Sequence, residues 1–131
     1  MVYELDGTRF DSLDGFYAEL DDKLGLAPWG HNLDAFNDIL RGGFGTPAGG
    51  FVLRWRHAER SRVALGYPET IRYLERKLGR CHPTNIPGVR ADIEAARRGE
   101  GPTLFEILVE IIREHGPGGR EAEDGVALEL A

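Results

Sequence analysis

The chain has almost no cysteine and no long apolar run. Its single cysteine, Cys81, has no second thiol with which to form an internal disulfide, which is typical of proteins in a reducing compartment. Without a long apolar run, a membrane-spanning helix is not expected. The first residues contain neither a basic leader nor a signal-like apolar stretch. We therefore expect one domain of 131 residues in the cytoplasm.

A surplus of positive charge is also absent, since the formal net charge is −6. Proteins that follow a phosphate backbone need lysine and arginine on the contacting face, so nucleic-acid binding is not expected. Residues 1–38 contain nine acidic and two basic residues, a net charge of −7, and the rest of the chain sums to +1. So acidic an N-terminal third would attract a cationic partner, although the same charge also aids solubility.

Hydrophobic spacing and capping signals predict a small α/β domain. Three segments have the β-branched and aromatic content of strands: residues 2–5, 51–55 and 126–130. Helical spacing with capping residues predicts helices at residues 13–24, 33–40, 68–78, 104–115 and, more weakly, 89–98. Helices between strands imply crossover connections, hence a three-stranded parallel sheet covered by helices, with residues 51–55 as the central strand.

The segment that begins at Asn32 holds the clearest candidate chemistry. Asn32 is a good helix cap, and Leu33, Phe36 and Leu40 follow with the spacing of a buried stripe. Asp34 and Asp38 lie four residues apart, so a helix exposes both carboxylates on one face. Two like charges at this spacing repel each other, and a cationic partner site that neutralises them gains binding energy.

Three sequence blocks form a distinctive set: Leu5-Asp6-Gly7, the run from Trp29-Gly30 through Asn32-Leu33-Asp34-Ala35 to Asp38, and Phe51-Val52-Leu53-Arg54-Trp55. In this order the blocks resemble the barstar family of intracellular ribonuclease inhibitors. The resemblance extends to Ser61 and returns at residues 104–130. Residues 63–101 are then an additional helical insert. The resemblance implies a single barstar-like domain over residues 1–131.

This resemblance implies a protein partner, namely a basic secreted ribonuclease that is barnase-like or of a related guanyl-specific type. The chain would be a monomer when free and would bind the enzyme 1:1. The inhibitor would protect the producing cell, and the carboxylate of Asp38 would take the place of a substrate phosphate in the active site. The expected partner-binding residues are Trp29, Gly30, Asn32, Asp34, Asn37, Asp38, Phe44 and Glu110.

Some of these positions depart from the family pattern. Pro28 stands where the family has a tyrosine, Asn37 replaces a tryptophan, and Phe44 is offset by one residue from a family aromatic. Glu110 aligns with an interface glutamate of the family, with Glu114 one turn further on. For Asn32, a role as a helix cap alone is as consistent with the pattern as a partner contact.

Other functions fit the sequence less well. His31 with Asp34 and Asp38 could form an acid–base or metal group, and Cys81-His82 suggests zinc, but a structural zinc site needs four ligands with paired spacing. We expect no catalytic residue, metal or cofactor. Alternating arginines at 54, 56, 60 and 62 could bind RNA, or could pair with the acidic N-terminal third. The alternative function is a non-inhibitory interaction module whose insert binds another protein.

Overall fold

The protein is built on a three-stranded parallel sheet in the order β1-β2-β3, as the computed structural model shows for residues 1–47 and 49–131. The strands are β1 (Val2–Asp6), β2 (Phe51–Arg56) and β3 (Val126–Leu130). The middle strand pairs on both sides, with Leu53 opposite Tyr3 and Leu128. Phe51, Leu53 and Trp55 are buried on alternate positions. The parallel sheet and the central position of β2 are confirmed.

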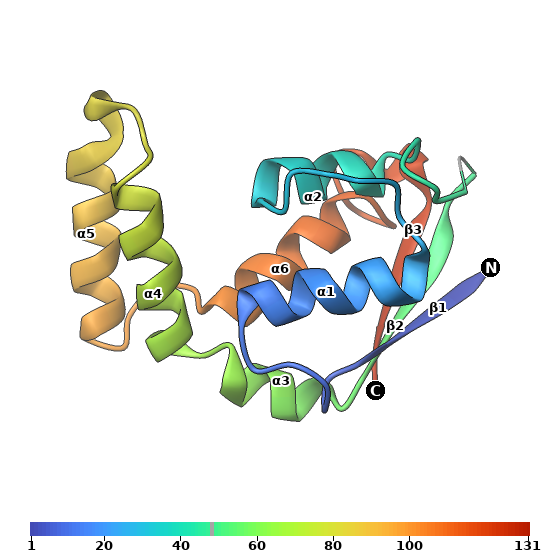
Figure 1. Ribbon diagram of the computed structural model, residues 1–131, viewed down its shortest axis with the longest axis horizontal. Coiled ribbons are helices and arrows are strands. Elements are labelled where there is room, and N and C mark those ends of the chain that lie inside the picture. Colours follow the sequence, from blue (N-terminus) through green and yellow to red (C-terminus); the bar gives the residue numbers. More distant parts are fainter. Residues whose placement is uncertain (48) are drawn as a thin grey trace.

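Helices cover this sheet and extend beyond it (Figure 1). They are α1 (Leu13–Leu24), α2 (Leu33–Leu40), α3 (Ala58–Ala64), α4 (Tyr67–Leu78), α5 (Ile86–Arg97) and α6 (Leu104–Glu114), with short 3-10 turns η1 (Pro83–Asn85) and η2 (Ala122–Asp124). In Figure 1, α1, α2 and α6 lie together beside the sheet. Trp55 is fully buried and stacks on Phe16 of α1. In the described part of the chain, every helix is too short or too polar to cross a lipid bilayer.

Helix α3 is absent from the elements expected from the sequence. His57 adopts a left-handed conformation (φ 55°) that ends β2, and the helix starts at Ala58. The buried Trp55 indole donates a hydrogen bond to Ser61 Oγ at 3.0 Å, which holds α3 beneath the end of the strand. Helix α5 also begins earlier than expected, at Ile86.

Helices α4 and α5 form a hairpin that projects away from the sheet (Figure 1). The hairpin has a small hydrophobic cluster of its own, centred on Leu74, Val89, Ile93 and Ala96. Tyr73 packs against both this cluster and the main core. The hairpin is thus a second packing unit joined to the first, within the segment that the sequence predicted as an insert.

Two polar contacts fix the start of α4 to the rest of the domain. The buried Glu69 accepts a hydrogen bond from the Leu13 backbone amide at 2.8 Å, at the start of α1. Its neighbour Thr70 accepts one from the Leu104 amide at 2.7 Å, at the start of α6. Backbone amides in the first turn of a helix have no hydrogen-bond acceptor within that helix. Side chains of α4 therefore supply the acceptors for one such amide in α1 and one in α6.

Candidate functional site

The candidate site is built on α2, and its cap and core contacts follow the sequence pattern. Asn32 Oδ1 accepts a hydrogen bond from the Ala35 amide at 2.8 Å, as an N-cap does. Phe36, Ile39 and Leu40 are buried. Asp34 and Asp38 are exposed, as predicted.

Asp38 is part of a surface ion-pair chain. Arg41 donates from Nη1 to Asp38 Oδ1 at 2.7 Å and from Nε to Glu121 Oε1 at 2.9 Å. Its Nη2 also lies 3.1 Å from Glu121 Oε2, so Arg41 holds both oxygens of that carboxylate. Hydrogen bonding to Glu121 raises the pKa of Arg41 above its ordinary value. Glu121 lies in the loop after α6 and is not among the partner-binding residues expected from the sequence.

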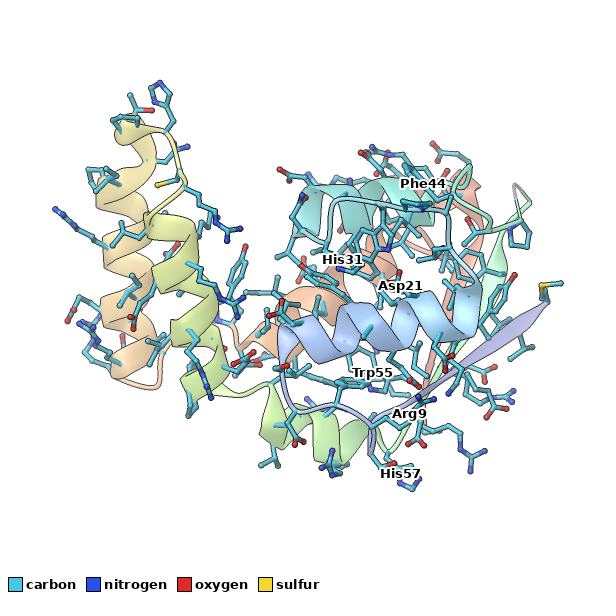
Figure 2. All side chains as sticks on the ribbon, in the orientation of Figure 1. Arg9, Asp21, His31, Phe44, Trp55 and His57 are labelled. Atoms are coloured by element: carbon cyan, nitrogen blue, oxygen red, sulfur yellow. The ribbon has the colours of Figure 1, made fainter. Side chains whose placement is uncertain are left out.

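The loop before α2 is held by Asp21 of α1. The indole Nε1 of Trp29 donates to Asp21 Oδ1, and His31 Nε2 lies 2.8 Å from Asp21 Oδ2 (Figure 2). His31 also stacks on Tyr17 with ring centroids 5.5 Å apart. The acidic partner of His31 is therefore Asp21 rather than Asp34 or Asp38. The Trp29 and His31 rings pack edge to face just before α2, with their centroids 4.6 Å apart.

Gly30 and Phe44 lie in the loops on either side of α2. The Gly30 carbonyl accepts a hydrogen bond from Asn32 Nδ2 at 3.2 Å. Beyond the other end of α2, the Phe44 carbonyl accepts one from the Ala27 amide at 2.8 Å, which ties the two loops together. The Phe44 side chain is half-buried. Seven of the eight predicted residues thus lie on α2 and these joined loops: Trp29, Gly30, Asn32, Asp34, Asn37, Asp38 and Phe44.

The side chain of Asn37 makes an internal contact. Its Oδ1 lies 2.6 Å from Nε2 of His115, a fully buried residue at the end of α6. The other ring nitrogen, Nδ1, lies 2.7 Å from Asp124 Oδ2. His115 therefore links α2 to the C-terminal loop. In the sequence, His115 is marked only as a polar residue at the end of a strongly apolar helix.

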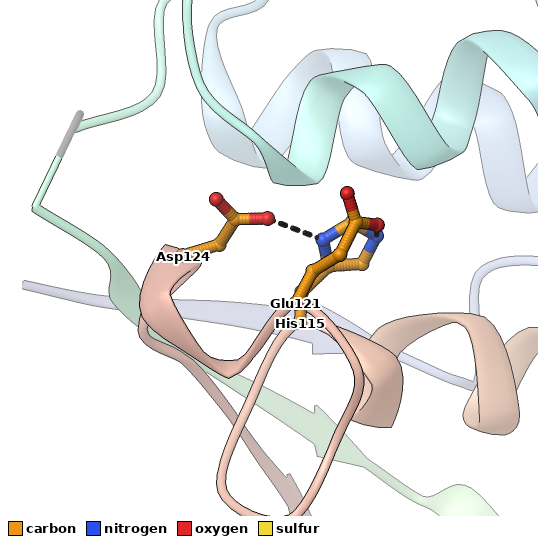
Figure 3. Close-up of side chains that lie close together, drawn as sticks. All are labelled: His115, Glu121 and Asp124. Carbon is orange, nitrogen blue, oxygen red and sulfur yellow. Dashed lines mark hydrogen bonds and ion pairs between the residues drawn. The ribbon is translucent and has the colours of Figure 1, made fainter.

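His115, Glu121 and Asp124 lie close enough together to suggest a metal site, with ligand atoms within 4.8 Å of one another (Figure 3). Their arrangement does not fit one ion, because Asp124 is bonded to Nδ1 while Glu121 lies 3.7 Å from Nε2 on the other side of the ring. Arg41 also occupies both oxygens of Glu121. The cluster is a hydrogen-bond network that joins α2, α6 and η2.

Glu110 is exposed on α6 and lines a groove of about 550 Å³ with Arg62, Arg113 and Leu130, near the end of β3. Its alternative, Glu114, accepts a hydrogen bond from Arg120 at 2.7 Å, and this bond lowers the pKa of Glu114. Within the described residues, no hydrogen bond or ion pair joins either glutamate to α2. The acid that the fold brings beside Asp38 is instead Glu121.

The four alternating arginines are engaged in ion pairs. Arg54 lies 2.8 Å from Glu129 and 3.3 Å from Glu4, and Arg56 lies 3.4 Å from the same Glu4. Arg60 pairs with Asp11 at 2.9 Å. Arg62 pairs with Glu59 at 3.3 Å and lies over the ring of Phe105. Three of the four therefore pair with acids of the N-terminal third, as the ion-pair interpretation predicted.

The family model described as Barstar (barnase inhibitor) matches residues 1–78. The match runs from β1 to the end of α4, so it includes α2 with both flanking loops and the first part of the predicted insert. No curated protein matches the chain.

Proposed function

The chain belongs to the barstar (barnase inhibitor) family, and from this membership we propose that it blocks the active site of a secreted microbial ribonuclease. In this proposal α2 enters the active-site cleft, and Asp38 takes the position of a substrate phosphate with Asp34 beside it. The ribonuclease is barnase-like or a related guanyl-specific enzyme, bound 1:1. The complex forms in the cytoplasm and protects the producing cell.

The observation that carries the proposal is the exposed Asp34 and Asp38 pair on a helix whose opposite face is buried. A ribonuclease active site must hold cationic groups for the phosphate of its substrate, and two carboxylates on one rigid face present the opposite charge. The barnase–barstar complex is itself the reference case for strong coupling between close interfacial charges. The acidic N-terminal third adds a long-range attraction toward such a basic enzyme.

The surrounding contacts are proposed from the positions of the remaining residues. Trp29, Gly30 and Asn32 precede α2, Phe44 follows it, and the bonds to Asp21 and Ala27 hold these loops before a partner arrives. Preorganised loops lose less conformational entropy on binding. Asn37 would contribute mainly by holding α2 against His115. Glu110, further along α6, would contribute a charge at the rim.

The direct test is titration of the purified chain into extracellular microbial ribonucleases, barnase among them, while RNA cleavage is followed. We expect stoichiometric loss of activity for at least one enzyme, with a sharp end point at one inhibitor per enzyme. Unchanged cleavage by every enzyme at micromolar excess of the chain would refute the inhibitor function.

The second candidate is a non-inhibitory interaction module on the barstar scaffold, with the segment 63–101 binding a different protein. Pro28 and Asn37 favour it, because they stand where the family places aromatic contacts. The two functions differ in their dependence on α2. If the chain is a non-inhibitory module, it should inhibit no ribonuclease, and Asp38→Ala should leave binding of its partner unchanged.

A further inference from the structure

A groove of about 650 Å³ separates the start of α2 from α4. Asn32 and Asp34 line it on the α2 side, and Tyr73, Lys77 and Arg80 line it on the hairpin side. Burial and the nearby charge of Asp34 raise the pKa of Tyr73, in keeping with the closeness of the two residues across the groove. The groove therefore begins at the surface proposed to enter the ribonuclease.

Two of the three cations on the hairpin side of the groove have no carboxylate partner among the described residues. The third, Arg76, is paired with Asp14 of α1 at 3.2 Å. No carboxylate in residues 1–47 or 49–131 forms an ion pair with Lys77 or Arg80, and both side chains are exposed. Two unpaired cations beside the acidic face of α2 divide this surface into a negative and a positive part.

The backbone that carries Lys77, with Arg80 just beyond the end of α4, is fixed relative to α2. Glu69 and Thr70 bond the first turn of α4 to α1 and α6, and Tyr73 packs against the main core. Lys77 lies two turns after Thr70 on the same continuous helix. A partner therefore meets a preformed pair of charged surfaces, which favours one docking register over others.

We propose that this groove binds an acidic segment of the same ribonuclease, adjacent to the cationic active site that receives Asp38. The inference rests on the proposed function and adds a second, oppositely charged contact to it. Lys77 and Arg80 would pair with carboxylates of the enzyme, and Tyr73 would supply apolar contact area. Enzymes with basic groups at this position would be rejected by like-charge repulsion, so the hairpin would select among ribonucleases.

The same charges argue against RNA in the groove. Asp14 and Asp34 line it together with the cations, and the chain as a whole is acidic. A phosphate backbone would meet carboxylates along the same surface. A protein segment can place carboxylates opposite Lys77 and Arg80 and leave neutral or basic groups opposite Asp34.

The first experiment compares two arginine reversals, Arg80→Glu in the groove and Arg90→Glu on α5, by calorimetric titration with the ribonuclease that the parent chain inhibits. Both arginines are exposed, and Arg90 does not line the groove. We expect Arg80→Glu to lower affinity about tenfold or more and Arg90→Glu to change it by less than about twofold. Lys77→Glu should act like Arg80→Glu, and matching urea midpoints would show that all three variants fold.

The second experiment uses the single native cysteine, because Cys81 is half-buried and lines the groove. Alkylation by iodoacetamide is timed for the free chain and for the saturated complex. We expect occupation of the groove to slow alkylation several-fold, with no engineered label required.

The outcomes separate the two proposals. A parent chain that binds no ribonuclease overturns both. Binding that Arg80→Glu and Arg90→Glu affect equally, with Cys81 alkylated at the free rate in the complex, overturns the groove contact and leaves the inhibitor function standing. Protection of Cys81 by an RNA oligonucleotide, or by raising the concentration of the chain alone, would assign the groove to RNA or to a second copy and overturn the proposal.

Discussion

Arg41 donates a hydrogen bond to Asp38 at 2.7 Å, and both residues are exposed. Because the same guanidinium binds Glu121, 80 residues after Arg41, the carboxylate proposed to mimic a phosphate is tied through Arg41 to the loop that follows α6. An exposed ion pair contributes little to folding stability. Its consequence is geometric, since it limits the orientations of Asp38 before a partner arrives.

Replacing Asp38 with alanine should weaken ribonuclease binding by several kcal/mol, because the cations of the enzyme would be buried without a partner. Asp92→Ala, which removes an exposed carboxylate from α5, is the matched control and should bind as the parent does. Calorimetry gives the affinities, and circular dichroism should be the same for all three proteins. Equal affinity of Asp38→Ala and the parent would rule out the phosphate-mimic mechanism even if inhibition is real.

Added salt should slow association with the ribonuclease more than it speeds dissociation. Residues 1–38 carry a net charge of −7, and their attraction for a basic enzyme acts over a distance that shrinks to about 10 Å at 0.1 M salt. Stopped-flow fluorescence at increasing ionic strength measures both rates. An association rate independent of salt would mean that the acidic N-terminal third serves only solubility.

His115→Ala should destabilise the fold by about 2–4 kcal/mol, because it creates a cavity and leaves Asn37 and Asp124 without their shared partner. His82→Ala is the control, since His82 is exposed in the loop between α4 and α5. Urea denaturation followed by tryptophan fluorescence measures the free energy of unfolding. The network has no structural role if both variants unfold at the same urea concentration.

Glu69→Ala should cost about 1–3 kcal/mol of folding stability, because the Leu13 amide at the start of α1 loses its acceptor in a buried position. Glu75→Ala removes the same side chain from an exposed position of the same helix and should be nearly neutral. Thermal unfolding of the two variants gives the comparison. A cost shared equally by both would mean that Glu69 does not fix the hairpin to the domain.

Alkaline pH should destabilise the protein in part through Tyr17, whose pKa is raised above its ordinary value by burial. Below about pH 10, where an exposed tyrosine ionises, this contribution to stability is fully present. Above it the unfolded chain releases the phenolic proton while the folded chain retains it, so stability falls as pH rises. Urea midpoints at about pH 8 and pH 11 should therefore differ less for Tyr17→Phe than for the parent.

Most of the secondary structure could be predicted from local pattern, because caps and apolar spacing act within one segment. The Thr103–Glu106 capping box starts α6 where expected, and Ser12 caps α1. Helix α3 could not be predicted in this way. It begins after a left-handed His57 and is held by the hydrogen bond from the buried Trp55 indole to Ser61, and neither feature follows from apolar spacing or a capping residue.

The sequence by itself determined α2, its cap and its two exposed carboxylates, because helical periodicity alone places Asp34 and Asp38 away from the buried face. Tertiary structure alone decided what surrounds them. Asp38 is linked through Arg41 to Glu121, Asn37 turns toward His115, and α4 brings Lys77 and Arg80 to a groove that begins beside Asp34. These relationships join residues far apart in the chain, and their proximity depends on how helices pack around a shared core rather than on spacing within any one helix.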